Sequence, residues 1–279
     1  MNKNKFPERD EDSLAAMFGA IALAAGLAIL DARRTGYTVR SKPDSSPVTD
    51  ADERAEKIIL AALAKQRPDI PVVAEECASR GELPEIAGAF ILVDALDGTR
   101  EFLSGSDDFT VNIALVRDRA PVAGAVFAPA LRRLWIGGRR GFVMPAEAGE
   151  PMPGPESWRP LQVRQGQSGR LSALISRSHM DDRSLALLER LSVSERKPVG
   201  SSMKFCLIAE GAGDVYPRFG PTMQWDTAAG EAVLRAAGGV VLGVDGAPLH
   251  YGAESKSYRN EGFVAWGDPA LAKATTIDD

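Results

Sequence analysis

Two aspartates follow a short apolar run and are spaced for cation binding. Phe90 to Val93 is apolar and bounded, and we expect it to form a buried strand. Asp94 and Asp97 come next, three positions apart, with Gly98 able to turn the backbone sharply. Both carboxylates and the intervening Leu96 carbonyl could then converge on one point, an oxygen arrangement that suits magnesium. The same residues are also typical of an ordinary Asp/Gly turn.

The preceding strand candidate also ends in acids. Ile70 to Ala74 terminates on Glu75 and Glu76, and Thr99 adds a hydroxyl beside the aspartate pair. Successive strands that end in carboxylates are expected where their carboxyl ends line one crevice. The pattern therefore favours a metal site over a simple turn.

Two further aspartates stand where helices begin. Asp52 lies in the first turn of a predicted helix that Thr49 or Asp50 caps, with Glu53 completing a capping box. Asp226 opens a later helix of small residues. Both can serve as acids at a helix terminus, and Asp226 could instead direct its carboxylate outward as a metal ligand.

Basic residues in the second half could hold an anion. Ser201 to Glu210 predicts a helix on which Ser201 and Lys204 share a face near the N-terminus, a place that attracts phosphate. Arg218 lies on the next predicted strand. Capping by Ser201 and solvent exposure of the two basic side chains explain the same pattern equally well.

The composition is that of an ordinary soluble globular protein, with 279 residues, 44% hydrophobic and 25% charged. A net charge of -5 offers no basic field for a nucleic-acid polymer, so we expect a small phosphorylated partner. Cys77 and Cys206 lack a C-x-x-C companion, which indicates free thiols in a reducing compartment. The two histidines, His179 and His250, are too separated for a usual zinc site. The motifs of nucleophile-elbow hydrolases and P-loop nucleotidases are absent.

A long uncharged stretch, Ser13 to Leu30, reaches the borderline length of a membrane span. Its larger residues recur at helical spacing, which predicts a buried helix instead. The acidic run before it, Glu8 to Asp12, does not fit a signal peptide. We therefore expect a cytoplasmic protein.

Strands and helices alternate along the chain and predict an α/β protein. Thr110 to Val116 and Pro121 to Phe127 predict an antiparallel hairpin. The proline-rich segment from Pro145 to Pro160 predicts a boundary between two lobes. We place a metal-binding α+β lobe at roughly 1–150 and an α/β substrate-recognition lobe at 151–279.

Three motifs together resemble the inositol monophosphatase superfamily of metal-dependent, lithium-sensitive phosphatases. They are Glu75-Glu76, the DALDGT run of 94–99 and the WDTAAG run of 225–230. The resemblance covers the chain as one domain and implies the family's α/β fold, an alternating αβαβα sandwich. Ala95 stands where the family motif usually has proline. We expect this change to loosen the turn without deleting a ligand.

The resemblance also implies a set of metal ligands and a catalytic pair. Two or three Mg²⁺ ions would be held by Glu75, Asp94, the Leu96 carbonyl, Asp97 and Asp226. Asp52 and Thr99 would orient the attacking water and take its proton, with Glu75 also in the catalytic set. A pair of metal ions can clamp an in-line phosphoryl displacement.

Within the superfamily, the second half of the chain resembles 3′(2′),5′-bisphosphate nucleotidases of the CysQ type. The segments that carry this are the ISRSH run ending at His179, the GSSMKFC run containing Ser201 and Lys204, the YPRFG run containing Arg218, and the REF run of 100–102 after the metal motif. They imply hydrolysis of adenosine 3′,5′-bisphosphate to AMP and phosphate. The following residues would contact the substrate: Gly98, Thr99, His179, Ser201, Lys204, Arg218 and Asp226.

Other functions stay open at this point. The sulfated nucleotide PAPS, inositol phosphates and other sugar phosphates are alternative substrates, and a nucleotide-binding regulator is a non-enzymatic alternative. A haloacid-dehalogenase-type phosphatase is disfavoured, because its D-x-D-G-T motif needs an acid where Ala95 stands. A homodimer and peripheral attachment to the inner membrane are expectations from the resemblance, and no basic amphipathic segment supports the attachment.

Overall fold

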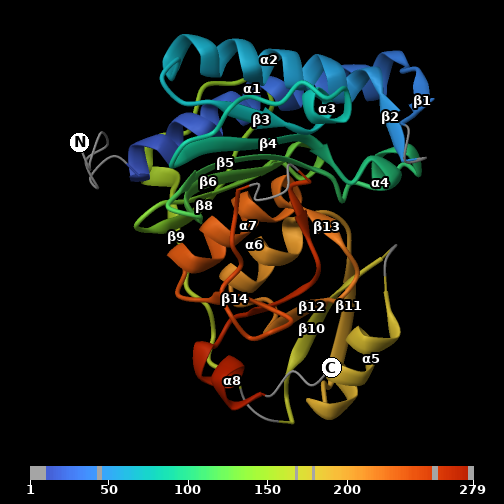
Figure 1. Cartoon of the computed structure of the whole chain (residues 1–279), viewed down its shortest axis with the longest axis vertical. Helices are drawn as coiled ribbons and strands as arrows, with labels where there is room; N and C mark the ends of the chain where they lie inside the picture. The colour runs from blue at the N-terminus through green and yellow to red at the C-terminus, as the bar shows by residue number, and fades with distance from the viewer. Residues whose placement is uncertain (1–10, 43–45, 167–168, 178–179, 253–256, 276–279) are drawn as a thin grey trace.

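Helices and sheets alternate in layers through the protein. The computed structural model describes residues 11–42, 46–166, 169–177, 180–252 and 257–275. Helices α1 (Glu11–Thr35) and α2 (Asp50–Gln66) form the top layer in Figure 1 and cover one face of a first sheet.

Two helices separate the first sheet from a second one. They are α6 (Met203–Ala209) and α7 (Gln224–Ala236), which share a buried apolar cluster with both sheets. Helix α5 (Asp182–Arg190) packs on the far face of the second sheet. The αβαβα layering predicted from the sequence is therefore confirmed (Figure 1).

The first sheet has seven strands in the order β3-β4-β5-β6-β7-β8-β9. β3 and β4 are parallel, and the following pairs are antiparallel. The strands are β3 (Val72–Ala74), β4 (Ala89–Asp97), β5 (Thr110–Arg117), β6 (Ala120–Ala128), β7 (Arg133–Gly137), β8 (Gly141–Pro145) and β9 (Arg159–Pro160). The hairpin predicted from the sequence is thus confirmed as β5 and β6.

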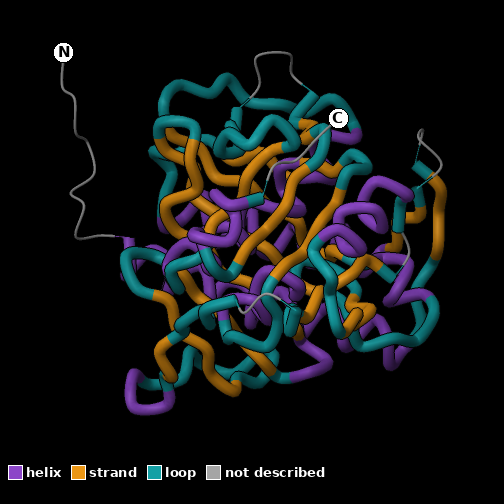
Figure 2. Tube along the Cα trace, turned by 90° about the horizontal axis from the view of Figure 1, so that it is seen from below, coloured by secondary structure: helices purple, strands orange, loops and turns teal. Residues whose placement is uncertain are grey.

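The second sheet has five strands in the order β11-β10-β12-β16-β14. They are β10 (Ser172–Ser176), β11 (Glu195–Val199), β12 (Val215–Arg218), β14 (Val240–Gly243) and β16 (Phe263–Trp266). Seen from below in Figure 2, orange strands cross the middle of the molecule with purple helices around them. The carboxyl ends of β10 and β12 face the same side, because β10 runs parallel to β12.

Short elements complete the chain. They are β1 (Val39–Ser41), β2 (Pro47–Thr49), α3 (Glu75–Ser79), α4 (Thr99–Leu103), the 3₁₀ turns at Pro129–Leu131 and Pro155–Ser157, β13 (Thr222–Met223), β15 (Arg259–Asn260) and α8 (Pro269–Ala274). Helix α8 is the last element of the described chain. Its N-cap Asp268 accepts a hydrogen bond from the Ala270 amide at 2.8 Å, which stabilises the helix start.

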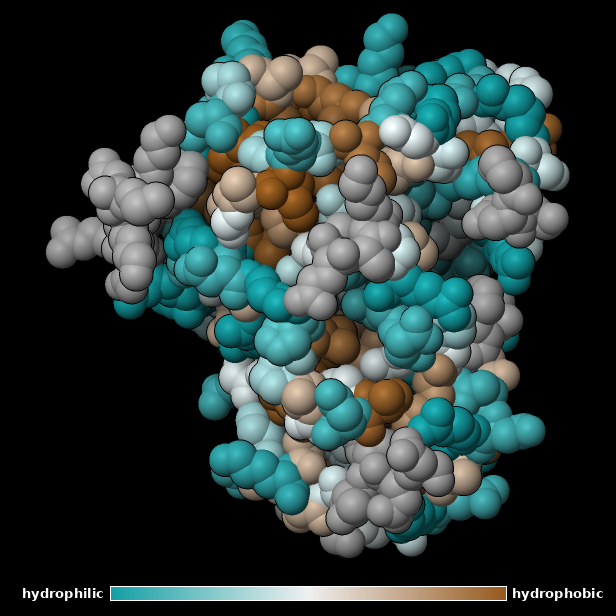
Figure 3. Space-filling model, in the orientation of Figure 1, coloured by the Kyte–Doolittle hydropathy of each residue, from teal (hydrophilic) through white to brown (hydrophobic). Residues whose placement is uncertain are grey.

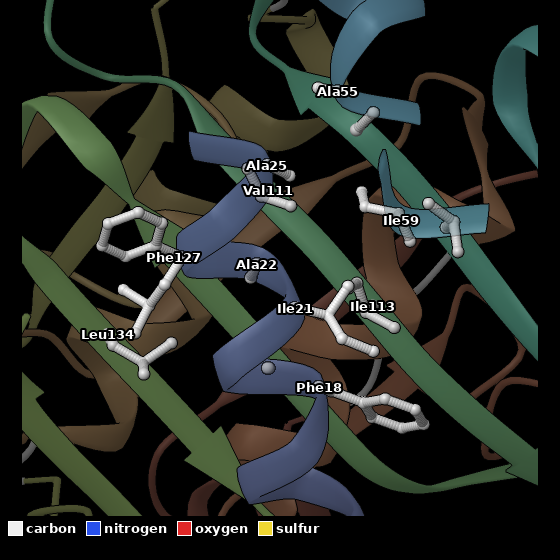
Figure 4. Packing of buried hydrophobic residues seen from close by; sticks show 14 of the residues in the cluster. Phe18, Ile21, Ala22, Ala25, Ala55, Ile59, Val111, Ile113, Phe127 and Leu134 are labelled. Carbon is white, nitrogen blue, oxygen red and sulfur yellow. The ribbon is translucent and has the colours of Figure 1, made fainter. Parts of the chain in front are cut away.

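Helix α1 packs tightly on the first sheet. Figure 4 shows Phe18, Ile21 and other side chains of α1 facing β5, β6 and β7. Gly26 permits close approach, since a Cβ there would lie 2.5 Å from the Phe127 ring. Burying a large apolar side chain such as Phe18 or Ile21 in this interface contributes about 1.5–3 kcal/mol to stability. The small residues of α1 are therefore explained by packing.

The apolar character of α1 reflects its buried position. It is long and apolar enough to cross a membrane by length and composition, but 56% of its most apolar window is buried inside the protein. The prediction of a buried helix is confirmed. Figure 3 shows apolar side chains, in brown, gathered over the upper layers with polar side chains around them. Leu27 is the large apolar side chain of α1 that is exposed.

Strand β4 is longer than the sequence predicted. The expected strand ended at Val93, yet β4 continues through Asp94 to Asp97. Pairing with β5 explains the difference, because Asp94 lies opposite Asn112 and Asp97 opposite Thr110. A bulge between Asp94 and Asp97 takes up the extra residues and re-aims their side chains.

The predicted helix starts differ in detail from the structure. Thr49, one of the two predicted caps, does cap α2, but Asp52 rather than Glu53 completes its capping box. Helix α6 begins at Met203, two residues after Ser201. Helix α7 begins at Gln224, so Asp226 lies inside its first turn. Of these residues, Ser201 and Asp226 line the candidate pocket, and Asp52 contacts it through Thr99.

A buried acid on α7 makes the stability of the fold depend on pH. The carboxylate of Glu231 is 2% exposed and accepts a hydrogen bond from the Tyr251 hydroxyl at 2.7 Å. Burial raises the pKa of Glu231 to about 7, although the Tyr251 hydrogen bond opposes the shift. The folded state therefore holds a proton that the unfolded state has already lost between about pH 4.5 and 7.

We expect stability to fall as pH rises through this window, by at most about 3 kcal/mol from Glu231. Glu231→Gln should remove this part, because glutamine keeps an acceptor for Tyr251 and does not titrate. The free energy of unfolding, measured by urea denaturation from pH 5 to pH 8, checks the prediction. Glu189→Gln on the exposed surface of α5 is the control. Parallel pH curves for the wild type and Glu231→Gln would contradict it.

Candidate functional site

A polar pocket of about 240 Å³ opens between the first sheet and the second-half elements. Its walls come from β4, α4, β10, α6, β12 and α7. The charged and hydroxyl residues in its lining are Ser46, Glu75, Asp94, Asp97, Thr99, Arg100, Glu101, Ser176, Ser201, Ser202, Lys204, Tyr216, Arg218, Thr222, Asp226 and Thr227. A pocket so rich in both acids and bases suits a cation together with an anionic ligand.

Three acids from distant parts of the sequence meet in this pocket. Glu75 opens α3, Asp94 lies on β4 and Asp226 lies in the first turn of α7. Each places one carboxylate oxygen within 4.8 Å of the other two. We call Glu75, Asp94 and Asp226 the acid cluster. Oxygen ligands gathered in this way fit a hard divalent cation.

Asp97 lines the same pocket beside the acid cluster. Its Oδ2 accepts the Ser202 amide at 2.5 Å and the Asn112 side-chain amide at 3.4 Å. The Ser202 hydroxyl in turn donates to Asn112 Oδ1 at 2.7 Å. One oxygen of Asp97 is therefore engaged with the start of α6. This contact joins β4 to the second half of the chain.

The bulge of β4 brings Leu96 and Thr99 next to these acids. Asp94 Oδ1 accepts the Leu96 amide at 2.9 Å, which fixes one oxygen of the carboxylate. The Thr99 hydroxyl lies 3.2 Å from the Leu96 carbonyl oxygen and 3.2 Å from Asp52 Oδ1. Thr99 therefore connects the predicted carbonyl ligand to the predicted base.

Gly98 is required by the turn that presents Thr99. Its φ is +91°, in the left-handed region that favours glycine. A Cβ at this position would also lie 2.9 Å from the Asp108 carbonyl oxygen. Any side chain would thus displace the turn, as the pattern Asp-Gly-Thr indicated.

Asp52 belongs both to helix α2 and to the pocket region. Its Oδ2 accepts the Thr49 amide at 2.8 Å and the Thr49 hydroxyl at 2.6 Å, which completes the capping box. Its Oδ1 is left for the Thr99 hydroxyl. Burial raises the pKa of Asp52, while the Thr49 hydrogen bonds lower it. A raised pKa improves the carboxylate as a proton acceptor near neutral pH.

Burial and mutual repulsion disfavour charge on the acids of the pocket. Burial raises the pKa of Asp94 and of Asp226, and the negative charges of Glu75 and Asp97 raise both further. The pKa of Asp97 is raised to about 6 by burial, against the opposing effect of Lys204. Carboxylates held together against such repulsion are typical of a site that a divalent cation neutralises. These residues therefore fit the metal that the family motif implies.

Lys42 places a positive charge beside the acid cluster, a position that the sequence did not indicate. Its Nζ lies 2.5 Å from Glu75 Oε1 and 2.7 Å from Glu76 Oε1, and the side chain is 8% exposed. Burial lowers the pKa of Lys42, but Glu75 and Glu76 raise it above its usual value overall. Lys42 lies in a segment with ordinary loop composition, so only the tertiary contact identifies it.

Lys204 is buried, and its contacts differ from those predicted. The sequence placed Lys204 with Ser201 at a helix N-terminus, but Ser201 precedes the helix with a φ of +51°. Lys204 Nζ donates to the carbonyls of Val199 at 3.1 Å and Ser201 at 2.6 Å. Burial lowers its pKa to about 8, although Asp97 opposes this effect. The lysine therefore stabilises the turn around Ser201 by binding two of its backbone carbonyls.

Arg218 and His179 complete the predicted substrate contacts. Arg218 lines the pocket and donates to the Pro221 carbonyl at 3.2 Å. Its buried Nε has no hydrogen-bond partner among the described residues. His179 lies outside the residues that the structure describes.

Some residues of the pocket were missed by sequence reasoning. Asn112 and Ser202 bind Asp97, and Arg100, to which the sequence assigned no role in the site, lines the pocket on α4. Asn112 left a signal, because it is a polar residue within the otherwise apolar strand TVNIALV. Ser202 is the N-cap residue of α6, but its hydroxyl bonds Asn112 rather than an amide of the helix.

The layered fold and the acid cluster define a class of protein: an α/β protein whose pocket suits a divalent cation and an anionic ligand. The profile of the inositol monophosphatase family matches residues 10–275. The chain belongs to the inositol monophosphatase family.

Relatives within the family agree with this placement. The 3′(2′),5′-bisphosphate nucleotidase CysQ of Salmonella typhimurium is 42% identical over 222 residues, which cover 80% of this chain and 86% of that protein. The crystal structure of CysQ from Bacteroides thetaiotaomicron has a TM-score of 0.75 and 33% identity, over 91% of this chain and 97% of that one. SuhB from Bartonella henselae shares the fold, with a TM-score of 0.72 and 24% identity over 94% and 96% of the two chains.

Proposed function

We propose that this protein is a Mg²⁺-dependent phosphatase that removes the 3′-phosphate of adenosine 3′,5′-bisphosphate to give AMP and phosphate. The acid cluster carries the proposal, because it brings together three acids that the sequence separates by up to 151 positions. The similarity to proteins named CysQ supports the nucleotide substrate. PAPS is proposed as a second substrate, and it would yield the corresponding 5′-phosphosulfate.

The ion ligands are proposed from the acid cluster and its neighbours. Two or three Mg²⁺ ions would be held by Glu75, Asp94, the Leu96 carbonyl, Asp97 and Asp226. When bound, Mg²⁺ stabilises charge on the phosphoryl group and lowers the pKa of the attacking water. The bulge in β4 serves this arrangement, since it lets Asp94 and Asp97 face the pocket from a single strand.

Asp52 and Thr99 are proposed to move the proton. Thr99 donates its hydroxyl hydrogen to Asp52 Oδ1, which leaves the hydroxyl oxygen able to accept a hydrogen bond from the attacking water. The water proton then passes through Thr99 to Asp52. The Gly98 and Thr99 amides would hold the transferred phosphate, and Asp226 would contact the substrate from the opposite wall of the pocket.

The remaining substrate contacts come from the second half of the chain. Lys204 and Arg218 supply positive charge to a pocket otherwise dominated by acids. The turn at Ser201, which Lys204 supports, would meet the nucleotide together with His179. We propose that these residues bind the adenosine and the phosphate that stays attached.

A phosphate-release panel tests the function. We expect wild-type protein with Mg²⁺ to prefer adenosine 3′,5′-bisphosphate over inositol 1-phosphate by at least about 10-fold in kcat/KM. Activity should disappear with chelator and fall with lithium. Lys204→Met should reduce the preference, because two buried carbonyls lose their donor and the Ser201 turn loosens.

The panel also separates the alternatives. The control is Lys197→Met, which removes a lysine that pairs with Glu195 on the edge strand β11. Equal rates on both substrates would instead favour an inositol-phosphate or sugar-phosphate monoesterase. Nucleotide binding without release of phosphate would identify a regulator.

We also propose a cytoplasmic location. Cys77 and Cys206 are free, as expected for a reducing compartment. A homodimer and peripheral attachment to the inner membrane stay predictions from the resemblance. Size-exclusion chromatography with light scattering measures the oligomeric state directly.

A further inference from the structure

Glu56 is a buried acid outside the proposed catalytic set. It lies on α2, one turn after Asp52, and its side chain is 4% exposed. Its Oε2 accepts the Glu76 amide at 2.8 Å, and its Oε1 accepts the Cys77 amide at 3.1 Å. Both oxygens of one buried carboxylate are therefore bound to consecutive amides of α3.

These two amides belong to the first turn of α3, which has no cap of its own. The N-cap residue is Ala74, whose side chain makes no hydrogen bond. The amides at the second and third helical positions are those that an N-cap side chain normally satisfies. Glu56 supplies that cap from a different helix, so α2 sets the direction in which α3 begins.

The first residue of α3 is Glu75, a member of the acid cluster. A helix as short as Glu75–Ser79 has little stability of its own, because helix nucleation is costly and few bonds follow it. Its orientation must come from outside contacts. The bonds from Glu56 hold the backbone directly after Glu75, and they therefore fix where the Glu75 carboxylate can point.

The charge of Glu56 is a cost that this contact offsets. Burial disfavours the charged form of Glu56 and raises its pKa, while the hydrogen bonds from the Glu76 and Cys77 amides lower it. Arg80 lies 3.9 Å from Glu56 Oε1, which is a long ion pair from a half-exposed arginine. A neutral side chain would avoid the cost of burying a charge at this position. The contribution of Glu56 therefore lies in its two carboxylate oxygens, which accept the Glu76 and Cys77 amides.

We propose that Glu56 is a positioning residue for the metal ligand Glu75, which it orients through the backbone of α3. The inference rests on the proposed ion site. It assigns Glu56 no contact with substrate or with the reacting atoms. Its effect should therefore appear in the affinity for Mg²⁺ before it appears in kcat.

The surroundings of Glu56 allow variants that fold. A groove between α2 and α3 is lined by Glu53, Glu56, Lys57, Leu60, Ala61 and Arg80. Water entering from this groove can reach the two amides when the carboxylate is removed, so Glu56→Ala need not leave them unsatisfied. Glu56→Gln keeps one acceptor but turns an NH₂ group toward the other amide.

Isothermal titration with Mg²⁺ at 15 °C tests the inference without substrate. We expect the dissociation constant to rise roughly 10-fold or more for Glu56→Ala and by a smaller factor for Glu56→Gln. Glu53→Gln should bind as the wild type does. It makes the same change of charge in the same groove but at a side chain that pairs with Arg40 on the surface. At saturating Mg²⁺, kcat should stay within about 3-fold.

Two other outcomes overturn the inference in distinguishable ways. A lowered melting temperature in chelator with an unchanged dissociation constant would show that Glu56 is only structural. If the wild type itself takes up no Mg²⁺, the ion site fails and the role of Glu56 fails with it. If Glu56→Ala does not fold, the titration of Glu56→Gln decides between the outcomes.

Discussion

Asp94→Asn is expected to lower kcat by at least about 10³-fold while the fold survives. The carboxylate of Asp94 lies in the acid cluster, and its Oδ1 holds the Leu96 amide. Asparagine keeps an acceptor for that amide but loses the charge that a divalent cation needs. A loss of about 4 kcal/mol of transition-state stabilisation corresponds to this factor, and a bound metal supplies several kcal/mol.

The stability of the same variant gives an independent measurement. Since burial and neighbouring acids already raise the pKa of Asp94, its charge is unfavourable in the protein without metal. We therefore expect the melting temperature of Asp94→Asn in chelator to equal or exceed that of the wild type. The rise that Mg²⁺ causes in the wild type should shrink in the variant.

The control is Asp118→Asn, the same chemical change on an exposed turn between β5 and β6. Asparagine tolerates the left-handed φ of +49° at that position. It should keep wild-type kcat and the full stabilisation by Mg²⁺. If Asp94→Asn kept both as well, Asp94 would not be an ion ligand.

Sequence reasoning succeeded where local chemistry determines the structure. Asp94, Gly98 and Thr99 could be placed next to one another because the apolar strand and the glycine requirement are both local, although Asp94 itself lies on β4. Asp226 was more difficult, since a cap and an outward carboxylate give the same pattern. In the structure the N-cap of α7 is Met223 and not Asp226, but Asp226 Oδ2 accepts the Met223 amide at 3.0 Å while its carboxylate lies in the acid cluster.

The residues that reasoning missed act across long sequence distances. Glu56 contacts amides 20 and 21 positions away, and Lys42 contacts Glu75 at a distance of 33 positions. Neither contact follows from helical or strand periodicity. The start of α6 was misplaced for a related reason. Ser201 has the left-handed φ in a turn that Lys204 supports, and the sequence does not show that this residue, rather than the neighbouring Gly200, adopts it.

Asp52→Asn should lower kcat by about 10²–10⁴-fold, the range typical of a lost general base. The affinity for Mg²⁺ should change little, because Asp52 meets the pocket through Thr99 rather than as an ion ligand. The fold should survive, since the side-chain oxygen of asparagine can still accept the Thr49 amide of the capping box. Steady-state kinetics at saturating Mg²⁺, together with titration of the ion, separate the two effects.

Thr99 gives a second test of the same proton path. If the proton passes through Thr99 to Asp52, the losses in kcat caused by changing each residue should not be additive. Thr99→Val should cost about as much as Asp52→Asn, and the double variant should cost little more than either. Thr99→Ser should restore activity to within a few-fold of the wild type, since serine keeps the hydroxyl between Asp52 Oδ1 and the Leu96 carbonyl. Losses that multiply in the double variant would mean that Asp52 acts through the capping box of α2 and not through Thr99.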